Sequence, residues 1–185
     1  MNTDRVQTSK FLSLVLRHKP EEAGVTLDRS GWCEVDALLD GLASRGFAIS
    51  REDLKQIVVE NDKKRFQFSD DEEYIRASQG HSVCVDLNYQ PQVPPVILYH
   101  GTAIRFLDAI AQQGIVKGAR QYVHLSNTVD VARKVGQRHG RPVVIPVAAL
   151  EMHKAGDLFY LTPNNVWLVE RVPREFLRFG ETLTF

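Results

Sequence analysis

The chain has 185 residues, of which 43% are hydrophobic and 25% charged, as is ordinary for a soluble globular protein of one compact domain or two small lobes. Lys plus Arg equals Asp plus Glu, 23 against 23, which argues against a broad basic face for nucleic acid, so any RNA binding must use a focal cationic site. The two cysteines, Cys33 and Cys84, exclude a disulfide framework and a cysteine-rich zinc site. No apolar run approaches the roughly 20 residues of a membrane span, and the N-terminus lacks an apolar signal core, so we expect a cytoplasmic protein.

Helical periodicity dominates the first third of the chain. Apolar residues recur at helical spacing over residues 8–18, and Pro20 ends this helix because the residue before a proline disfavours helical dihedral angles. A second helix is expected to begin near Val35 and to end at Gly46. A third follows Ser50, a favourable N-cap residue with an acidic residue three positions later.

The periodicity then changes from helical to alternating. Phe66 and Phe68 alternate with Arg65 and Gln67, a polar turn follows, and a return strand begins at Tyr74. If the two phenylalanines face the core, Arg65 points the other way and is displayed rather than buried. Three helices followed by a β-hairpin are typical of a winged-helix domain, although many unrelated sequences share this outline.

A change in composition marks a boundary after the hairpin. Three prolines and little apolar content in residues 86–95 indicate a linker between a lobe of residues 1–85 and a second lobe of residues 96–185. In the second lobe we expect strands over residues 96–99, 122–125, 143–147 and 166–169, and helices over residues 103–113 and 128–135. The predicted fold class is α+β, with a second lobe rich in short strands.

Arginine and histidine side chains stand at several element ends. Arg17 and His18 end the first helix, where the helix dipole favours cations by about 0.3–1 kcal/mol, and His18 also continues the apolar face as a core histidine would. His100, Gly101 and Thr102 follow a buried strand directly; such a segment is suited to gripping a ribose or an amide, but is more often a turn.

A second strand carries further polar side chains. By alternation Tyr122, His124 and Ser126 share one face, and Arg120 joins it if the strand extends back; an amphipathic edge strand explains the pattern equally well. Two other polar segments have ordinary structural explanations as a loop and a solvated helix end, namely residues 79–82 and the basic run Arg133, Lys134, Arg138, His139 and Arg141.

The available chemistry rests on these arginines and histidines. The six histidines show no metal-ligand spacing, so no metal site is expected, and no nucleophile elbow, P-loop or GxGxxG is present. Guanidinium and imidazole groups stabilise charge on phosphate and move a proton, but supply no strong nucleophile. The nucleophile is therefore expected to come from the substrate, and a phosphate oxygen would serve.

Taken in order, these motifs resemble the NAD⁺-dependent RNA 2′-phosphotransferase family over nearly the whole chain. They are Leu16-Arg17-His18-Lys19-Pro20, Lys64-Arg65-Phe66, Arg76-Ala77-Ser78-Gln79-Gly80-His81-Ser82, Tyr99-His100-Gly101-Thr102, Arg120 with Val123-His124-Leu125-Ser126, Arg138-His139-Gly140 and Val166-Trp167-Leu168. The resemblance implies an N-terminal winged-helix RNA-binding lobe and a C-terminal ADP-ribosyltransferase-like lobe that binds NAD⁺ as co-substrate. It also implies a place in tRNA splicing or processing, and we expect a monomer.

The reaction implied by the resemblance has two steps. The RNA 2′-phosphate attacks the anomeric carbon of the nicotinamide ribose and expels nicotinamide, which gives an RNA-2′-phospho-ADP-ribose intermediate. The 2″-hydroxyl then attacks phosphorus and releases 2′-hydroxyl RNA and ADP-ribose 1″,2″-cyclic phosphate.

The resemblance also implies roles for individual residues. The catalytic set is Arg17, His18, Arg65 and Arg120, with His18 moving a proton in the second step. The NAD⁺-binding set is His100, Gly101, Thr102, His124, Ser126 and Val166, and weaker substrate-binding candidates are Gln79, His81 and Arg138.

Two departures from the family pattern and two rival functions accompany this interpretation. Tyr122 stands where the family often carries a histidine, and Asn165 stands where a glycine is common; asparagine tolerates left-handed dihedral angles, so we expect that turn to persist.

The first rival function is that of an ADP-ribosyltransferase acting on another acceptor. The catalytic glutamate of such enzymes commonly stands where this chain has Val166, and Glu170 lies about 13 Å further along the strand. The second rival is a non-catalytic winged-helix RNA or DNA binder.

Overall fold

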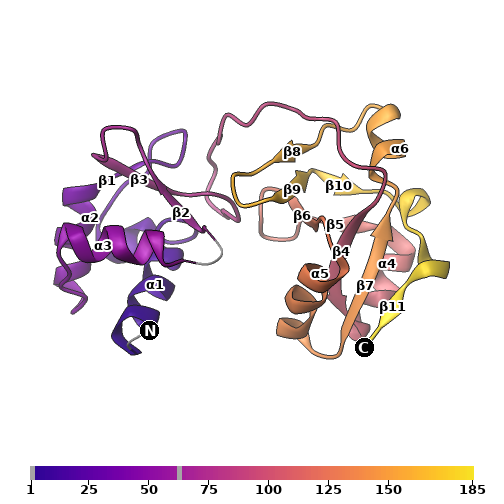
Figure 1. Cartoon of the computed structure of the whole chain (residues 1–185), viewed down its shortest axis with the longest axis horizontal. Helices are drawn as coiled ribbons and strands as arrows, with labels where there is room; N and C mark the ends of the chain where they lie inside the picture. The colour runs from indigo at the N-terminus through magenta and orange to yellow at the C-terminus, as the bar shows by residue number, and fades with distance from the viewer. Residues whose placement is uncertain (1–2, 62–63) are drawn as a thin grey trace. The chain divides into compact units, whose positions relative to one another are not determined.

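The computed structural model describes residues 3–61 and 64–185, and it is an α+β structure of helices and antiparallel sheets (Figure 1). This confirms the predicted α+β class. Residue contacts divide the chain into two compact units, Met1–Asn88 and Tyr89–Phe185, which we call unit 1 and unit 2. No helix in the described part of the chain is both long and apolar enough to cross a membrane.

The helices of unit 1 follow from local sequence signals. The structure contains α1 (Thr3–Val15), α2 (Val35–Ser44) and α3 (Arg51–Val59). α3 begins with a capping box, in which the Ser50 side chain accepts from the Asp53 backbone N–H and the Asp53 carboxylate accepts from the Ser50 backbone N–H. The predicted starts of α2 and α3 are thereby confirmed.

The first helix begins and ends earlier than the predicted residues 8–18, since it spans Thr3–Val15 and residues 16–18 form a turn after its end. Leu12 and Val15 of α1 and Leu16 just after it are buried, whereas His18 is exposed. The interpretation of His18 as a core histidine is therefore wrong.

The sheet of unit 1 has the strand order β1-β3-β2 among the described residues. β2 (Phe66–Phe68) and β3 (Tyr74–Ala77) form the predicted antiparallel hairpin, and β1 (Cys33–Glu34) pairs with the other edge of β3. Sequence reasoning missed β1, because two residues are too short to show alternation.

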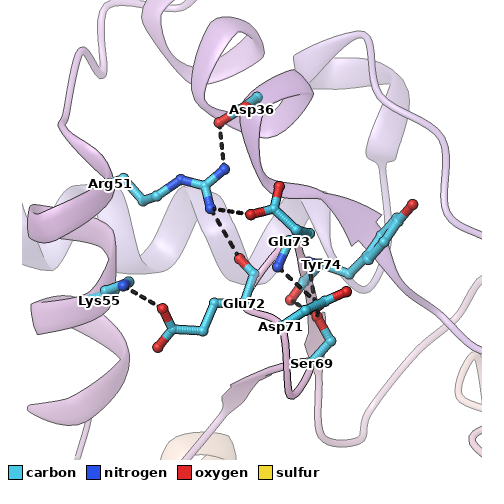
Figure 2. A network of polar contacts seen from close by, with 8 residues as sticks. All are labelled: Asp36, Arg51, Lys55, Ser69, Asp71, Glu72, Glu73 and Tyr74. Atoms are coloured by element: carbon cyan, nitrogen blue, oxygen red, sulfur yellow. Dashed lines mark hydrogen bonds and ion pairs between the residues drawn. The ribbon is translucent and has the colours of Figure 1, made fainter.

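A polar network holds the turn of this hairpin against two helices (Figure 2). The guanidinium group of Arg51 donates to the carboxylates of Asp36 and Glu73 and to the backbone carbonyl of Glu72. Lys55 forms an ion pair with the Glu72 carboxylate. The turn between β2 and β3 is thus fixed to α2 and α3 by side chains of α3.

Unit 2 is built on a six-stranded antiparallel sheet with the order β11-β7-β4-β6-β9-β8 across residues 89–185, all of which are described. The strands are β4 (Leu98–Ala103), β6 (Val123–Ser126), β7 (Pro142–Val147), β8 (Tyr160–Leu161), β9 (Val166–Val169) and β11 (Leu183–Thr184). β5 (Ile115–Val116) and β10 (Arg171–Val172) form a separate pair, and the α-helices are α4 (Leu107–Gln113), α5 (Val129–Gly136) and α6 (Ala149–Lys154).

The predicted bounds of one strand and the predicted start of the following helix are wrong in unit 2. The strand expected over residues 96–99 lies at Leu98–Ala103, and the helix expected from residue 103 begins at Leu107, after a 3₁₀ turn. β4 continues because it pairs with β7 along its whole length, up to Ala103 opposite Pro142. Long-range pairing has overridden the local helical pattern.

Candidate functional site

In unit 1, Arg17 and His18 lie in the turn that follows α1. The His18 backbone N–H donates to the Leu14 carbonyl, while the Arg17 carbonyl accepts from the Ser82 backbone N–H at 2.9 Å. The Ser82 Oγ lies 3.0 Å from His18 Nδ1, and both residues are exposed. A loop residue thus contacts both the backbone of Arg17 and the imidazole ring of His18.

The same loop also contacts the segment that carries Arg65. The Ser78 backbone N–H donates to the Arg65 carbonyl at 2.8 Å, and the Ser78 Oγ donates to the Lys64 carbonyl at 2.9 Å. Arg65 precedes β2 and its side chain is partly exposed, so the prediction that it is displayed is confirmed. Residues 78–82, which we call the bridging loop, therefore tie the turn after α1 to the start of the hairpin.

His81 lies inside unit 1 rather than on its surface. Only 1% of the residue is exposed, and neither ring nitrogen has a hydrogen-bond partner among the described residues. Burial lowers the pKa of His81 to about 4, with the positive charges of Arg17, His18 and Arg76 acting in the same direction. His81 is therefore neutral at pH 7 and buried, whereas Gln79 of the same loop is partly exposed.

In unit 2, His100 occupies the point where two strands separate. Within the described residues β4 and β6 are in register at Tyr99 and Ser126, and further along His100 Nδ1 lies 3.3 Å from the His124 carbonyl oxygen. A carbonyl only accepts, so Nδ1 carries the proton and Nε2 is the acceptor of the ring. Burial lowers the pKa of His100 to about 4, partly opposed by the His124 hydrogen bond and assisted by the charges of His139 and Arg120.

Arg120 lies in the loop before β6 and contacts His124 of that strand. Arg120 Nη1 is 3.5 Å from His124 Nδ1, and because a guanidinium group only donates, His124 Nδ1 is the acceptor. The Arg120 side chain retains exposed surface, yet partial desolvation, followed by the charge of Arg138, lowers the pKa of its guanidinium group. Arg120, His124, His100 and Arg138 thus interact within unit 2.

The strand β6 confirms the alternation predicted for its side chains. Val123 and Leu125 are buried, whereas His124 and Ser126 are partly exposed. The Tyr122 ring meets the Tyr160 ring edge-on at a centroid distance of 5.7 Å. Tyr160 of β8 and His124 of β6 are both in register with Leu168 of β9, so their side chains lie on the same face of the sheet.

The turn before β9 places Val166 opposite Ser126. Asn165 has φ of 58°, which confirms the predicted left-handed turn. Thr162 closes this turn, because its backbone N–H donates to the Val166 carbonyl and its Oγ1 accepts from the Val166 N–H.

Gly101 is required by helix packing. A Cβ at this position would lie 1.8 Å from the Ala132 carbonyl oxygen of α5, and a Cβ at Gly136 would lie 2.4 Å from the Thr102 carbonyl oxygen. α5 therefore lies directly on β4. Since neighbouring side chains on a strand alternate, His100 and Thr102 point away from α5.

Sequence reasoning missed the structural role of Arg76. Its guanidinium carbon lies 4.4 Å above the Trp32 ring, and Nη1 donates to the Ser30 carbonyl at 3.2 Å. These contacts hold residues 30–32 beside β3, and Gly31 of this segment packs against the His81 ring. No local signal predicts this contact, because its partners are far apart in the sequence.

The geometry defines an α+β protein whose polar sites are built from guanidinium, imidazole and hydroxyl groups. Among the described residues, no group of three or more His, Cys, Asp or Glu side chains could hold a metal ion. Three of the predicted catalytic residues, Arg17, His18 and Arg65, belong to unit 1, and Arg120 belongs to unit 2.

Comparisons with known proteins identify the family. A family model described as RNA 2′-phosphotransferase, Tpt1/KptA family, matches residues 3–171. A probable RNA 2′-phosphotransferase of Pseudomonas aeruginosa is 54% identical over 172 residues, which cover 92% of this chain and 94% of that protein. Proteins of the same description from Trichormus variabilis and Rhodopirellula baltica are each 51% identical, and each match covers 94% of this chain and 95% of the relative.

The chain belongs to the RNA 2′-phosphotransferase, Tpt1/KptA family. It is therefore an enzyme, a transferase with the RNA 2′-phosphotransferase activity of that family.

Proposed function

We propose that the enzyme removes an internal 2′-phosphate from RNA by transferring it to NAD⁺, through an RNA-2′-phospho-ADP-ribose intermediate. The family match over residues 3–171 carries this proposal. We propose further that unit 1 is a winged-helix lobe that binds RNA and that unit 2 is an ADP-ribosyltransferase-like lobe that binds NAD⁺.

The residues of unit 2 fit a ribose of the co-substrate. His100 is neutral at pH 7, and its Nδ1–H is engaged by a backbone carbonyl, so Nε2 is left to accept a hydrogen bond from a ribose hydroxyl. Thr102 lies on the same face of β4 and supplies a hydroxyl. His124 and Ser126 belong to β6 and Val166 to β9, while Gly101 of β4 offers its backbone groups to the co-substrate.

In the first step, a 2′-phosphate oxygen forms a bond to the anomeric carbon, and the carbon–nitrogen bond to nicotinamide breaks with its electron pair leaving on nicotinamide. In the second step, the ribose 2″-oxygen forms a bond to phosphorus, and the bond between phosphorus and the RNA 2′-oxygen breaks. The proton lost by the 2″-hydroxyl ends on the RNA 2′-oxygen. Arg17, Arg65 and Arg120 stabilise the phosphate charge, and His18 moves the proton.

A direct assay tests the reaction. A short RNA with one internal 2′-phosphate is incubated with the enzyme, with and without NAD⁺, and the products are resolved by mass. We expect NAD⁺-dependent loss of the phosphate, with ADP-ribose 1″,2″-cyclic phosphate and nicotinamide as co-products. Consumption of NAD⁺ with unchanged RNA would overturn the proposal in favour of an ADP-ribosyltransferase with another acceptor.

One observation weighs against that rival. Glu170, the carboxylate nearest in sequence to the position of an ADP-ribosyltransferase glutamate, forms an ion pair with Lys117 at 3.4 Å. Val166 occupies the position itself. β9 therefore carries no carboxylate that could activate a different acceptor.

A further inference from the structure

A basic surface with an exposed aromatic ring lies at one end of unit 2. We call it the basic patch, and it consists of Arg105, Phe106, Arg138, His139 and Arg141, all of which are exposed. It belongs to the turn between α5 and β7 and to the segment that follows β4 (Figure 1).

Backbone and ring contacts hold the two segments of the basic patch together. The Ile104 backbone N–H donates to the Arg141 carbonyl at 3.1 Å, and Ala103 is in register with Pro142. The Phe106 ring meets the His139 ring edge-on at 6.5 Å, and the Arg105 guanidinium carbon lies 4.8 Å from the centre of the Phe106 ring. The patch is therefore a built surface rather than a set of scattered side chains.

The arginines of the basic patch, Arg105, Arg138 and Arg141, form no ion pair with any residue in the described part of the chain, although the chain as a whole has no net charge. A chain without net charge can bind a polyanion only where cations are concentrated locally. The basic patch is such a focal cationic site.

Two residues of the patch act electrostatically on the candidate site of unit 2. The charge of Arg138 lowers the pKa of Arg120, and the charge of His139 lowers the pKa of His100, so both pairs lie within electrostatic range. The basic patch and the candidate site of unit 2 are thus electrostatically coupled.

We propose that the basic patch binds the single-stranded RNA that flanks the 2′-phosphate. The guanidinium groups of Arg105 and Arg141 contact backbone phosphates, and a base stacks on the exposed Phe106 ring, which is the combination typical of single-strand binding surfaces. This inference rests on the proposed function for the identity of the RNA as substrate, but binding is measurable without catalysis.

The first experiment measures binding alone. Fluorescence anisotropy follows a 12-nucleotide single-stranded RNA without a 2′-phosphate as the salt concentration is varied. In the Arg105→Glu/Arg141→Glu double variant we expect roughly tenfold weaker binding, and a salt dependence whose logarithmic slope is smaller by about 0.7 per lost phosphate contact. In Phe106→Ala we expect roughly tenfold weaker binding with an unchanged slope. The matched control is Lys154→Glu/Arg174→Glu, which reverses two exposed charges on α6 and the 3₁₀ turn after β10, and should leave binding unchanged.

The second experiment separates flank binding from the reaction. KM is measured for a 2′-phosphorylated trinucleotide and for a 12-nucleotide RNA with the same modified site. In the patch variants we expect KM to rise for the long RNA only, with KM for NAD⁺ and kcat on the trinucleotide unchanged, which also shows that the variants are folded. If charge reversal disturbs folding, the Arg105→Gln/Arg141→Gln double variant takes its place.

The outcomes distinguish the two proposals. Equal affinity of wild type and patch variants for the 12-nucleotide RNA would overturn the basic patch as an RNA surface. A rise in KM for NAD⁺ alone would likewise overturn it and assign the patch to the co-substrate. Absence of turnover by wild type on both RNAs would count against the proposed reaction, while the anisotropy measurement would still decide the flank proposal.

Discussion

The Ser82 hydroxyl lies 3.0 Å from Nδ1 of His18, and the backbone N–H of the same serine donates to the carbonyl of Arg17. One loop residue therefore contacts both the imidazole ring and the backbone of the neighbouring arginine. A histidine that is exposed to solvent needs such a contact to hold one orientation.

Removal of this hydroxyl tests its role. In Ser82→Ala we expect kcat to fall roughly fivefold with KM for NAD⁺ little changed, because a hydrogen bond that orients a proton-transfer group contributes about 1 kcal/mol. Steady-state kinetics over pH 5–9 would show a shifted profile, and Ser82→Thr should restore most of the rate. Ser44→Ala, which removes a hydroxyl on α2 that bonds the Gly41 carbonyl, is the control. An unchanged pH profile in Ser82→Ala would rule out an orienting role.

The division of labour between the two chemical steps gives a second prediction. In Arg65→Ala and in His18→Ala we expect the first step to proceed better than the second, because both side chains are proposed to act mainly on the transesterification. Mass analysis of quenched reactions should then show accumulated RNA-2′-phospho-ADP-ribose. If neither variant yields this species under conditions in which wild type turns over, the assignment fails.

The contact between Gly101 and α5 predicts a large loss of stability on adding a methyl group. In Gly101→Ala the new Cβ would lie 1.8 Å from a backbone oxygen of α5, which cannot move aside as a flexible side chain can. We expect a decrease in the free energy of unfolding of about 3 kcal/mol, measured by urea denaturation. Gly180→Ala is the matched control, because nothing lies within 4 Å of its Cβ position, and its change should stay within about 0.5 kcal/mol.

Buried histidines predict a loss of stability in acid. The folded state lowers the pKa of His81 to about 4, below its usual 6.5, so between these values the unfolded chain binds more protons than the folded chain. The free energy of unfolding should therefore fall as pH is lowered from about 6.5 toward 4. His81→Leu should flatten this slope in urea titrations at pH 7 and pH 5. A variant as pH-sensitive as wild type would show that other groups are responsible.

The left-handed turn before β9 gives the last prediction. Asn165 has φ of 58°, a conformation that costs a β-branched residue about 1–2 kcal/mol. Asn165→Val should lower the thermal midpoint by several degrees, whereas Asn165→Gly should leave it nearly unchanged. Equal midpoints for the two variants would contradict a requirement for the left-handed conformation.

Local signals were sufficient to predict several elements of secondary structure. The capping box at Ser50 and Asp53 predicted the start of α3, and the alternation of Phe66 and Phe68 predicted the hairpin. The run of residues 166–169 predicted β9. These elements are decided by neighbours a few residues apart, so a sequence carries their pattern directly.

Other features depended on contacts between distant parts of the chain. β4 extends to Ala103 because β7 pairs with it, and Gly101 is required by α5 rather than by a turn. His18 is exposed and oriented by Ser82, which no periodicity could indicate.

By itself, the sequence determined the fold class, the short-range elements and, through its ordered motifs, the family. The tertiary structure alone decided which histidines are buried and neutral, which nitrogen of His100 accepts, and where unpaired cations gather into the basic patch. The physical reason is that burial, desolvation and charge proximity arise from groups that folding brings together across the chain, and these groups have no fixed separation in the sequence.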